Sequence, residues 1–342
     1  MPGRPQLKVI IVGNRAGTNI GGSLEYACKE IGVPVSVWES RCAAEGSAFL
    51  RHLNWRFRGR RPSRLGRFSK GLVEFCRAWR PTHLIATGIA PVNKQALHDL
   101  GAMNINRLNY LTDDPFSSAH YAPWFLRSLP EYDTVFSPRL GNMDDLTKLG
   151  CNRVAYLPFG YAPELGLHEM PAVALDPYRS DIFFAGGADR DRIAYISALS
   201  DVKIDVGLYG DYWDRYAETR SITRGYADLN LLRLAIHAAK VSLCLVRRAN
   251  RDGHSMRTFE LAASGTCMLV EDTDEHRSIF GEDKEAVVYF RSISEMAERA
   301  VWLLGNCGER ARLGATVKRL ILSGRHTYRD RLTSMLGIDG AN

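Results

Sequence analysis

The stretch from Asn250 to Gly265 holds the residues whose types and spacing point most directly to chemistry. Ser255 is a typical N-cap, which places Arg257 in the first turn of the following helix. The helix dipole disfavours a cation there unless an anion is bound. Glu260 comes one turn later, where a carboxylate can accept both hydroxyls of a ribose. The pattern favours a bound nucleoside diphosphate, and the alternative is a surface ion pair worth about 0.2–0.5 kcal/mol.

Two adjacent carboxylates, Asp113 and Asp114, follow an apolar segment and precede Pro115. Open α/β sheets hold ligands beyond the carboxyl ends of their strands, so one carboxylate could be a general base toward a hydroxyl. An Asp cap before a proline at the first helical position would give the same pattern. Both can hold, with Asp114 capping and Asp113 left for chemistry. His120 is a secondary candidate, since a lone His is more often structural.

A glycine-rich loop precedes the first predicted helix, where backbone N–H groups and the helix dipole favour an anion. It lacks both the G-x-G-x-x-G spacing of dinucleotide sites and the Gly-Lys-Ser/Thr of a P-loop. Contact with phosphate or substrate and tight packing are equally open interpretations. The residues predicted for this acceptor or phosphate loop are Gly13, Asn14, Gly17, Gly21 and Gly22.

A second glycine pair, Gly186 and Gly187, lies between an apolar segment and a predicted helix that begins with arginines, Arg192 among them. These arginines could clamp phosphates. The alternative is an exposed first turn whose aspartates neutralise them. Tyr209 and Gly210 end the next predicted strand, where aromatic residues could stack on a base or pack in the core.

Between Asn54 and Val73 the chain is basic, with cations at positions 56–70 and no acid, and Trp55, Phe57 and Phe68 are interleaved. This basic run could meet an anionic acceptor, a membrane surface or nucleic acid. The alternative is a mobile, solvated loop, and the run is predicted to be confined to one loop.

Short apolar segments alternate with amphipathic ones, which is the βαβ rhythm of a parallel sheet covered by helices. The predicted strands are 8–13, 33–38, 82–87, 105–111, 134–137 and 154–157, then 181–185, 204–209, 241–246, 267–270 and 286–290. The predicted helices include 23–31, 190–199, 229–239 and 255–264, with two or three more over 294–336. Segment 161–179 contains prolines and shows neither helical nor strand periodicity. It is predicted to link two similar halves, 1–160 and 180–322. A helix within 323–342 is predicted to pack back on the first half.

The composition is that of a globular protein with anionic partners. Across 342 residues, Lys+Arg is 45 and Asp+Glu is 38, so the net charge is +7. The seven cysteines form no CxxC and no zinc spacing, which favours reduced thiols, several of them buried, and predicts no metal site. No run reaches the ~18 apolar residues of a membrane span, and the start lacks the apolar core of a signal peptide. We therefore expect a cytoplasmic protein.

The run His254-Ser-Met-Arg257-Thr-Phe-Glu260-Leu-Ala-Ala-Ser-Gly265, then Phe280-Gly-Glu-Asp-Lys-Glu285-Ala-Val-Val-Tyr-Phe290, resembles the C-terminal half of GT-B glycosyltransferases. It is most similar to the branch named for the spore-maturation protein CgeB. Asp113-Asp114-Pro115, the strand end Phe-Ala-Gly-Gly187 and His326-Thr-Tyr-Arg-Asp-Arg331 also resemble that branch. The resemblance spans most of 105–335 and is specific over 254–290.

The resemblance implies an α/β GT-B fold, with two Rossmann-like domains facing each other across a cleft, an N-terminal acceptor domain and a C-terminal donor domain. It implies metal-independent transfer of a sugar from a UDP-, GDP- or dTDP-linked donor. In retaining relatives two acids separated by seven residues serve the donor, and Glu260 matches the second, which holds the ribose. Asp252 stands eight positions earlier, where those relatives usually have Glu. Retention is expected on this match.

The predicted catalytic residues are Asp113, His120 and Asp252. The predicted donor-binding residues are Gly186, Gly187, Arg192, Tyr209, Gly210, His254, Ser255, Arg257 and Glu260. We expect no cofactor besides the nucleotide-sugar substrate, an acceptor that is a glycan, a lipid-linked molecule or a protein, and contact of 56–70 with the inner membrane face. The alternatives are a sugar-nucleotide epimerase or hydrolase, or a non-catalytic protein that binds anions or nucleic acid. Nucleic acid is disfavoured because no nucleic-acid motif is present.

Overall fold

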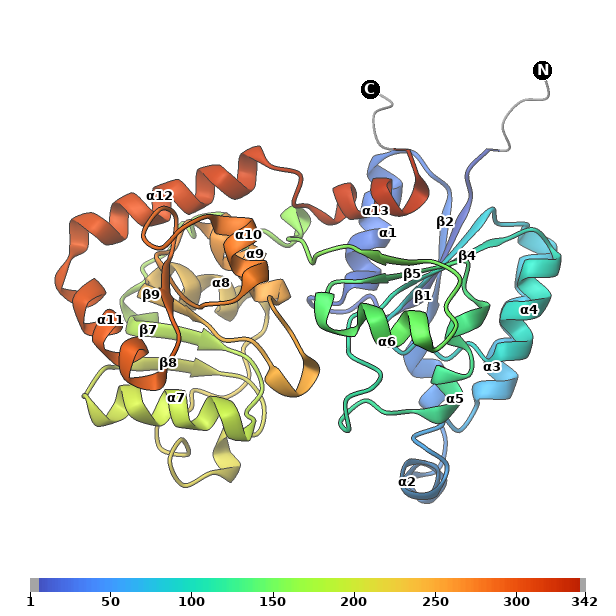
Figure 1. Cartoon of the computed structure of the whole chain (residues 1–342), viewed down its shortest axis with the longest axis horizontal. Helices are drawn as coiled ribbons and strands as arrows, with labels where there is room; N and C mark the ends of the chain where they lie inside the picture. Colours follow the sequence, from blue (N-terminus) through green and yellow to red (C-terminus); the bar gives the residue numbers. More distant parts are fainter. Residues whose placement is uncertain (1–5, 339–342) are drawn as a thin grey trace. The chain divides into compact units, whose positions relative to one another are not determined.

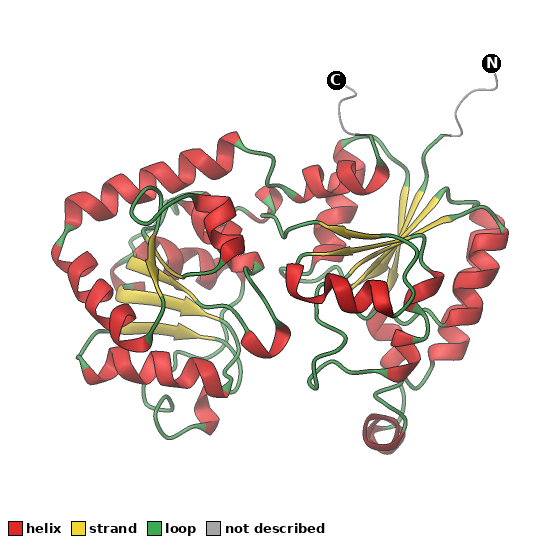
Figure 2. Ribbon diagram, viewed as in Figure 1, coloured by secondary structure: helices red, strands yellow, loops and turns green. Residues whose placement is uncertain are grey.

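A computed structural model describes residues 6–338, apart from the side chains of residues 48, 50, 51 and 55. The chain folds into two compact units (Figures 1 and 2). Unit 1 comprises the chain up to Pro158, the short segment Ala249–Arg251 and the chain from Tyr328 onward. Unit 2 comprises Phe159–Arg248 and Asp252–Thr327. Each unit is built around its own parallel sheet, so the predicted α/β class is confirmed.

The sheet of unit 1 has the strand order β2-β1-β3-β4-β5-β6. Its strands are β1 (Val9–Gly13), β2 (Val35–Glu39), β3 (His83–Thr87), β4 (Asn106–Tyr110), β5 (Thr134–Ser137) and β6 (Val154–Tyr156). All five ladders are parallel. β1 is buried along its whole length, as expected of an apolar strand covered on both faces.

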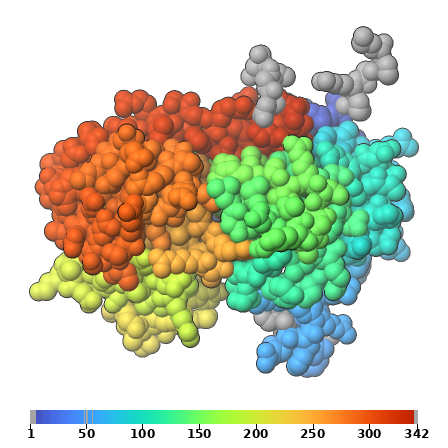
Figure 3. All heavy atoms as spheres, viewed as in Figure 1, coloured from blue at the N-terminus to red at the C-terminus, as the bar shows by residue number. Residues whose placement is uncertain are grey.

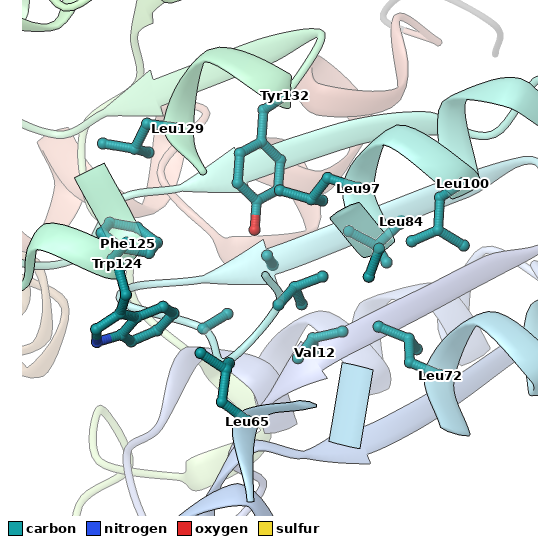
Figure 4. Close-up of a cluster of buried hydrophobic side chains, with 14 of the residues drawn as sticks. Val12, Leu65, Leu72, Leu84, Leu97, Leu100, Trp124, Phe125, Leu129 and Tyr132 are labelled. Atoms are coloured by element: carbon teal, nitrogen blue, oxygen red, sulfur yellow. The ribbon is translucent and has the colours of Figure 1, made fainter. Parts of the chain in front are cut away.

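Helices cover this sheet on both faces, and buried apolar side chains fill the space between them (Figure 4). The helices are α1 (Ile20–Glu30), α2 (Ala48–Phe57), α3 (Leu65–Trp79), α4 (Lys94–Ala102), α5 (Pro123–Leu126), α6 (Met143–Lys148) and α13 (Tyr328–Leu336), with 3-10 turns η1 (Ser40–Ala44), η2 (Leu129–Glu131) and η3 (Leu140–Asn142). α13 packs on α1. The segment 161–179 belongs to unit 2 and contains two 3-10 turns, η4 (Pro163–Leu165) and η5 (Asp176–Tyr178).

The prediction that the basic run lies in one loop is wrong. The run begins at the end of α2, crosses a turn and continues into α3. Leu65, Phe68, Leu72 and Cys76 of α3 are all buried, and their helical spacing places them on one face. The interleaved cations occupy the opposite, solvated face. Phe68 therefore belongs to the core, where its ring meets Trp38 edge-on.

The sheet of unit 2 has the order β11-β10-β9-β7-β8 and is also entirely parallel. Its strands are β7 (Ser180–Ala185), β8 (Val206–Tyr209), β9 (Ala239–Cys244), β10 (Met268–Glu271) and β11 (Val288–Phe290). Its helices are α7 (Arg190–Asp201), α8 (Leu229–Ala238), α9 (Met256–Ser264), α10 (Asp274–Phe280), α11 (Ile293–Gly305) and α12 (Cys307–Ser323), with 3-10 turns η6 (Trp213–Arg215) and η7 (Arg248–Asn250), the latter running into unit 1.

Both sheets have the same topology. The order β2-β1-β3-β4-β5 in unit 1 corresponds to β8-β7-β9-β10-β11 in unit 2. In such sheets the strand order reverses between the first and third strands, and ligands bind beyond the carboxyl ends at that switch point. The fold therefore directs attention to the ends of β1 and β3 and to the ends of β7 and β9.

The C-terminal end of α9 is packed against α12 through two glycines. Gly265 terminates α9 in a left-handed conformation with φ 79°. A Cβ on Gly314 of α12 would lie 2.3 Å from the carbonyl oxygen of Gly265. The two helices can approach this closely only because Gly314 has no side chain.

Candidate active site

Two helices begin at the switch point of unit 2. α7 follows β7 and α9 follows β9, and these strands are parallel neighbours. The N-termini of α7 and α9 therefore lie at the same edge of the sheet. Unpaired N–H groups and the helix dipoles make such an edge favourable for an anion.

The turn after β7 packs tightly against the turn after β8. A Cβ on Gly210, whose φ is 130°, would lie 2.2 Å from the carbonyl oxygen of Gly186, so this position requires glycine. The N–H of Gly186 donates to the carbonyl of Tyr209, and a Cβ on Gly187 would lie 3.6 Å from Nη2 of Arg247. Tyr209 itself is buried against Phe183, so its ring belongs to the core.

Two arginines share one carboxylate at this switch point. The side chain of Arg192, 9% exposed, lies with its Nε 3.5 Å from Asp189 Oδ2, and Arg247 Nε lies 3.7 Å from the same oxygen. Arg192 also donates to the carbonyl of Gly187 at 3.1 Å. Burial and the nearby charge of Arg247 lower the pKa of Arg192, and Asp252 acts in the opposite direction. A bound anion would relieve this repulsion between the arginines.

At the start of α9, Arg257 and Glu260 form an ion pair with 2.5 Å between Nη1 and Oε2. Glu260 is buried and Arg257 is partly buried, so the pair is not the solvated surface pair considered as the alternative. Ser255 precedes the helix as predicted, and its N–H donates to the hydroxyl of Thr258 at 3.1 Å. A carboxylate and a guanidinium one turn apart are thus held within a structured helix terminus.

A buried polar network lies behind this helix terminus. His254 is fully buried, with Nδ1 2.6 Å from Glu275 Oε2 and with Nε2 accepting the N–H of Phe159 at 3.1 Å. His276 donates from Nδ1 to the carbonyl of Glu271, and burial lowers its pKa to about 4. Both ring nitrogens of His254 are occupied, so its position supports a structural role and not the predicted donor contact.

Sequence reasoning missed Glu271, the last residue of β10. Its Oε2 accepts the N–H of Val246 at 3.1 Å, and its Oε1 accepts Arg248 Nη2 at 2.9 Å. Arg248 also reaches the hydroxyl of Tyr195 on α7. Glu271 thereby fixes the loop after β9 that carries Arg247. A lone buried acid at the end of a predicted strand was the only available signal.

In unit 1, Asp113 and His120 come together beyond the end of β4, with 3.5 Å between Oδ1 and Nε2. Both side chains are partly exposed, at 37% and 26%. The buried Arg139, which sequence reasoning also missed, donates to the carbonyls of Leu111 and Thr112 and so fixes the segment leading to Asp113. This pair combines a carboxylate with an imidazole that it can orient.

Asp114 has a different role from its neighbour. No helix begins at Pro115, so the predicted helix cap is wrong, and Asp114 instead accepts the N–H of Phe116 within a turn. Its carboxylate is buried and accepts Arg251 Nε at 2.6 Å. Hydrogen bonds to Asp114 raise the pKa of Arg251. Asp114 is therefore structural through its contact with Arg251 and not as a helix cap, while Asp113 remains partly open to solvent.

The first glycine-rich loop is tightly packed. α1 begins at Ile20, earlier than predicted, so Gly21 and Gly22 lie within its first turn. A Cβ on Gly21 would lie 2.7 Å from the carbonyl oxygen of Asn14, and one on Gly13 would lie 2.4 Å from the hydroxyl of Thr87. Gly17 has φ 63°. Close packing accounts for Gly13 and Gly21, and the left-handed backbone accounts for Gly17. Contact with phosphate stays a prediction.

The cysteines are all unpaired, and burial raises the pKa of five of them to about 11 or 12. Within residues 6–338, no group of three or more His, Cys, Asp or Glu side chains is arranged to hold a metal ion. No helix in that range has both the length and the apolar character needed to cross a bilayer.

Part of unit 2 and the C-terminal end of the chain are similar to a known family. Residues 192–337 match the family model described as glycosyl transferase-like. No curated protein matches the chain. Among solved structures, sucrose-phosphate synthase from Thermosynechococcus elongatus superposes with a TM-score of 0.68 at 13% identity, covering 97% of this chain and 98% of that chain.

Two further structures have the same fold. One is α,α-trehalose 6-phosphate synthase from Burkholderia multivorans, with a TM-score of 0.65, 12% identity and coverage of 97% and 98%. The other is a putative UDP-N-acetylglucosamine 2-epimerase from Listeria monocytogenes, with a TM-score of 0.59, 11% identity and coverage of 98% and 98%. These likenesses confirm the expected GT-B fold. The fold and the family match together support a glycosyltransferase.

Proposed function

We propose that the protein transfers a sugar from a nucleoside diphosphate sugar to an acceptor, and that unit 2 binds the donor. The observation that carries this proposal is the switch-point edge of unit 2. Two helix N-termini begin there beside Arg192 and Arg247, and α9 adds the Arg257–Glu260 pair. This combination suits a diphosphate joined to a ribose.

The cations at this edge stabilise the leaving group. When the bond between the sugar C1 and the diphosphate oxygen breaks, its electron pair stays on the diphosphate, whose charge increases. Arg192, Arg257 and the N–H groups of the helix termini face that charge without reorganisation. We propose that this set replaces a metal ion in stabilising the diphosphate.

Glu260 anchors the ribose. Its carboxylate is buried and one of its oxygens contacts Arg257, so the pair presents an acceptor and a donor of hydrogen bonds side by side. The buried network around His254 and Thr258 fixes the start of α9 and hence the position of both side chains.

The acceptor hydroxyl loses a proton as its oxygen bonds to the sugar C1. We propose the Asp113–His120 pair of unit 1 as the base. Nε2 of His120 faces Asp113, so Nδ1 is the atom that takes the proton. Retention of configuration is proposed because Glu260 matches the second acid of retaining relatives and Asp252 stands at the spacing of the first, with Asp in place of the usual Glu. NMR of the product anomer tests it.

The finer assignment is to the CgeB-like branch, acting in the cytoplasm on a glycan, lipid-linked or protein acceptor. The assignment to the branch is supported by the Arg257-Thr-Phe-Glu260 run and by Tyr289-Phe290 within strand β11. A sugar-nucleotide epimerase is the second candidate, because the Listeria structure named as a putative 2-epimerase has the same fold. Incubation with donor alone separates the two, since an epimer or a free sugar formed without acceptor contradicts transfer.

Calorimetric titration of the purified protein with UDP-, GDP- and dTDP-sugars tests the donor site. We expect one of them to bind and Glu260→Ala to weaken it roughly tenfold or more, because the ribose hydroxyls lose a charged acceptor. Glu298→Ala, an exposed acid on α11, is the control and should bind like the wild type. No binding by any donor contradicts the proposed function, and unchanged binding by Glu260→Ala contradicts the ribose assignment.

A further inference from the structure

Helix α2 carries two large aromatic side chains that are mostly exposed. Phe49 is 74% and Phe57 is 73% exposed. With 3.6 residues per turn, Phe49, Leu53 and Phe57 lie within an arc of about 80° on one side of the helix. We call this side of α2, with Arg56 at its flank, the α2 face. The α2 segment protrudes at the lower edge of unit 1 (Figures 1 and 3).

The surroundings of the α2 face are strongly basic. Residues 46–73 contain seven arginines, one lysine and no Asp or Glu. Arg56, Arg58 and Arg61 are exposed next to the aromatic side chains. Like charges repel one another within such a cluster, and the exposed Phe side chains leave apolar surface in water, so an anionic partner with an apolar layer would stabilise it.

The turn after α2 is anchored to the rest of unit 1. Arg60 donates to the carbonyls of Ser118 and Ala119. Gly59 has φ 57°, and a Cβ there would lie 2.6 Å from Cδ of Pro123. On the inner side of the helix, Asn54 is buried and its Nδ2 lies 3.3 Å from Ser63 Oγ. The α2 face is therefore presented from a fixed base.

We propose that α2 is an interfacial helix that docks unit 1 on an anionic lipid bilayer. Phe49 and Phe57 enter the boundary between headgroups and acyl chains, and Arg56, Arg58 and Arg61 contact lipid phosphates. Charge complementarity selects an anionic partner. The two aromatic side chains lie on one side of a single helix, about 12 Å apart along its axis, which fits a planar bilayer better than stacking on bases.

Sedimentation with phosphatidylcholine vesicles, with and without about one third phosphatidylglycerol, tests the docking. We expect the wild type to bind only the anionic vesicles and binding to weaken as salt rises. The double variant F49S/F57S and the triple variant R56Q/R58Q/R61Q should each lower the partition coefficient about tenfold or more. One matched control is Y226S, which alters a Tyr that is 74% exposed, and the other is R153Q/R220Q/R319Q, which alters three exposed arginines outside residues 46–73. Both should bind like the wild type.

Three outcomes overturn the proposal: no binding of the wild type to anionic vesicles, full binding by either α2 variant, or binding of single-stranded nucleic acid in place of vesicles. Melting temperatures of the variants should match the wild type, because the altered side chains are exposed. Donor titration of F49S/F57S reports separately on unit 2. If the protein binds lipid but no donor, this inference stands and the proposed transferase function fails. If it binds a donor but no lipid, only the lipid docking fails.

Discussion

The switch points of unit 1 and unit 2 occupy the same place in the same topology but carry different side chains. In unit 2, Arg192 and Arg247 gather around Asp189. In unit 1, the equivalent strand ends meet through Gly13 and Thr87, which leave no room even for a Cβ. The shared topology therefore puts a ligand-binding edge at the same position in both sheets, but the side chains at the two edges differ. Unit 2 gathers positive charge, and unit 1 offers the Asp113–His120 pair one strand further along.

Replacing His120 gives the largest effect expected from this comparison. His120→Gln should lower kcat by about 10²–10⁴-fold, because the acceptor hydroxyl loses its base. Donor affinity should not change, since His120 belongs to unit 1 and the donor site to unit 2. Steady-state kinetics with donor titration measures both quantities, and the exposed His98→Gln is the control. If His120→Gln lowers donor affinity as much as it lowers kcat, His120 contributes to donor binding and the proposed roles of the two units are wrong.

Replacing Arg257 should give the next largest effect and a different signature. Arg257→Gln removes a charge that faces the diphosphate, so kcat/KM should fall about 10²–10³-fold and donor affinity should fall with it. Arg220→Gln, an exposed arginine in the same unit, serves as control. Unchanged donor affinity in Arg257→Gln would place the diphosphate elsewhere than at α9.

The buried His276 predicts a smaller effect on stability. Its pKa is about 4 in the folded protein against 6.5 for an unperturbed His, so between these values the unfolded chain binds the proton and the folded chain does not. Stability is therefore fully present above pH 6.5 and declines as the pH falls toward 4, by about 3 kcal/mol at most.

Urea unfolding measured across that pH window checks this expectation. Hydrogen exchange of amides in unit 2 measures the stability of that unit separately. Burial also lowers the pKa of His83 in unit 1 and of His237, so both add to the same trend. His276→Gln should reduce the dependence of the unfolding free energy of unit 2 on pH and leave that of unit 1 unchanged. If the pH dependence of unit 2 is the same in the variant and the wild type, His276 does not govern its acid sensitivity.

The strands were predictable because each is a short apolar run with few alternatives. Thr134–Ser137 was predicted to the residue, and other strand ends differed by only one or two residues in most cases. The helix over Leu65–Trp79 was missed because seven cations nearby hid a regular apolar spacing. Its buried face becomes obvious only when Leu65, Phe68 and Leu72 are considered without the arginines between them.

The candidate site was predictable only where its determinants are local. Ser255 as a cap and Arg257 with Glu260 follow from spacing along one helix. The role of His254 could not be predicted, because its partners Phe159 and Glu275 are distant in sequence. Arg139 and Glu271 escaped notice for the same reason, since each acts largely on backbone groups of other segments.

The glycine contact at the far end of α9 makes the donor helix dependent on a remote position. At its N-terminus α9 is fixed by the polar network, and at its C-terminus Gly314 leaves room for the carbonyl of Gly265. Any side chain at position 314 must push α12 away or tilt α9 and its arginine. A random-mutagenesis screen for loss of sugar transfer should accordingly recover bulky changes at residue 314, far from any substrate atom.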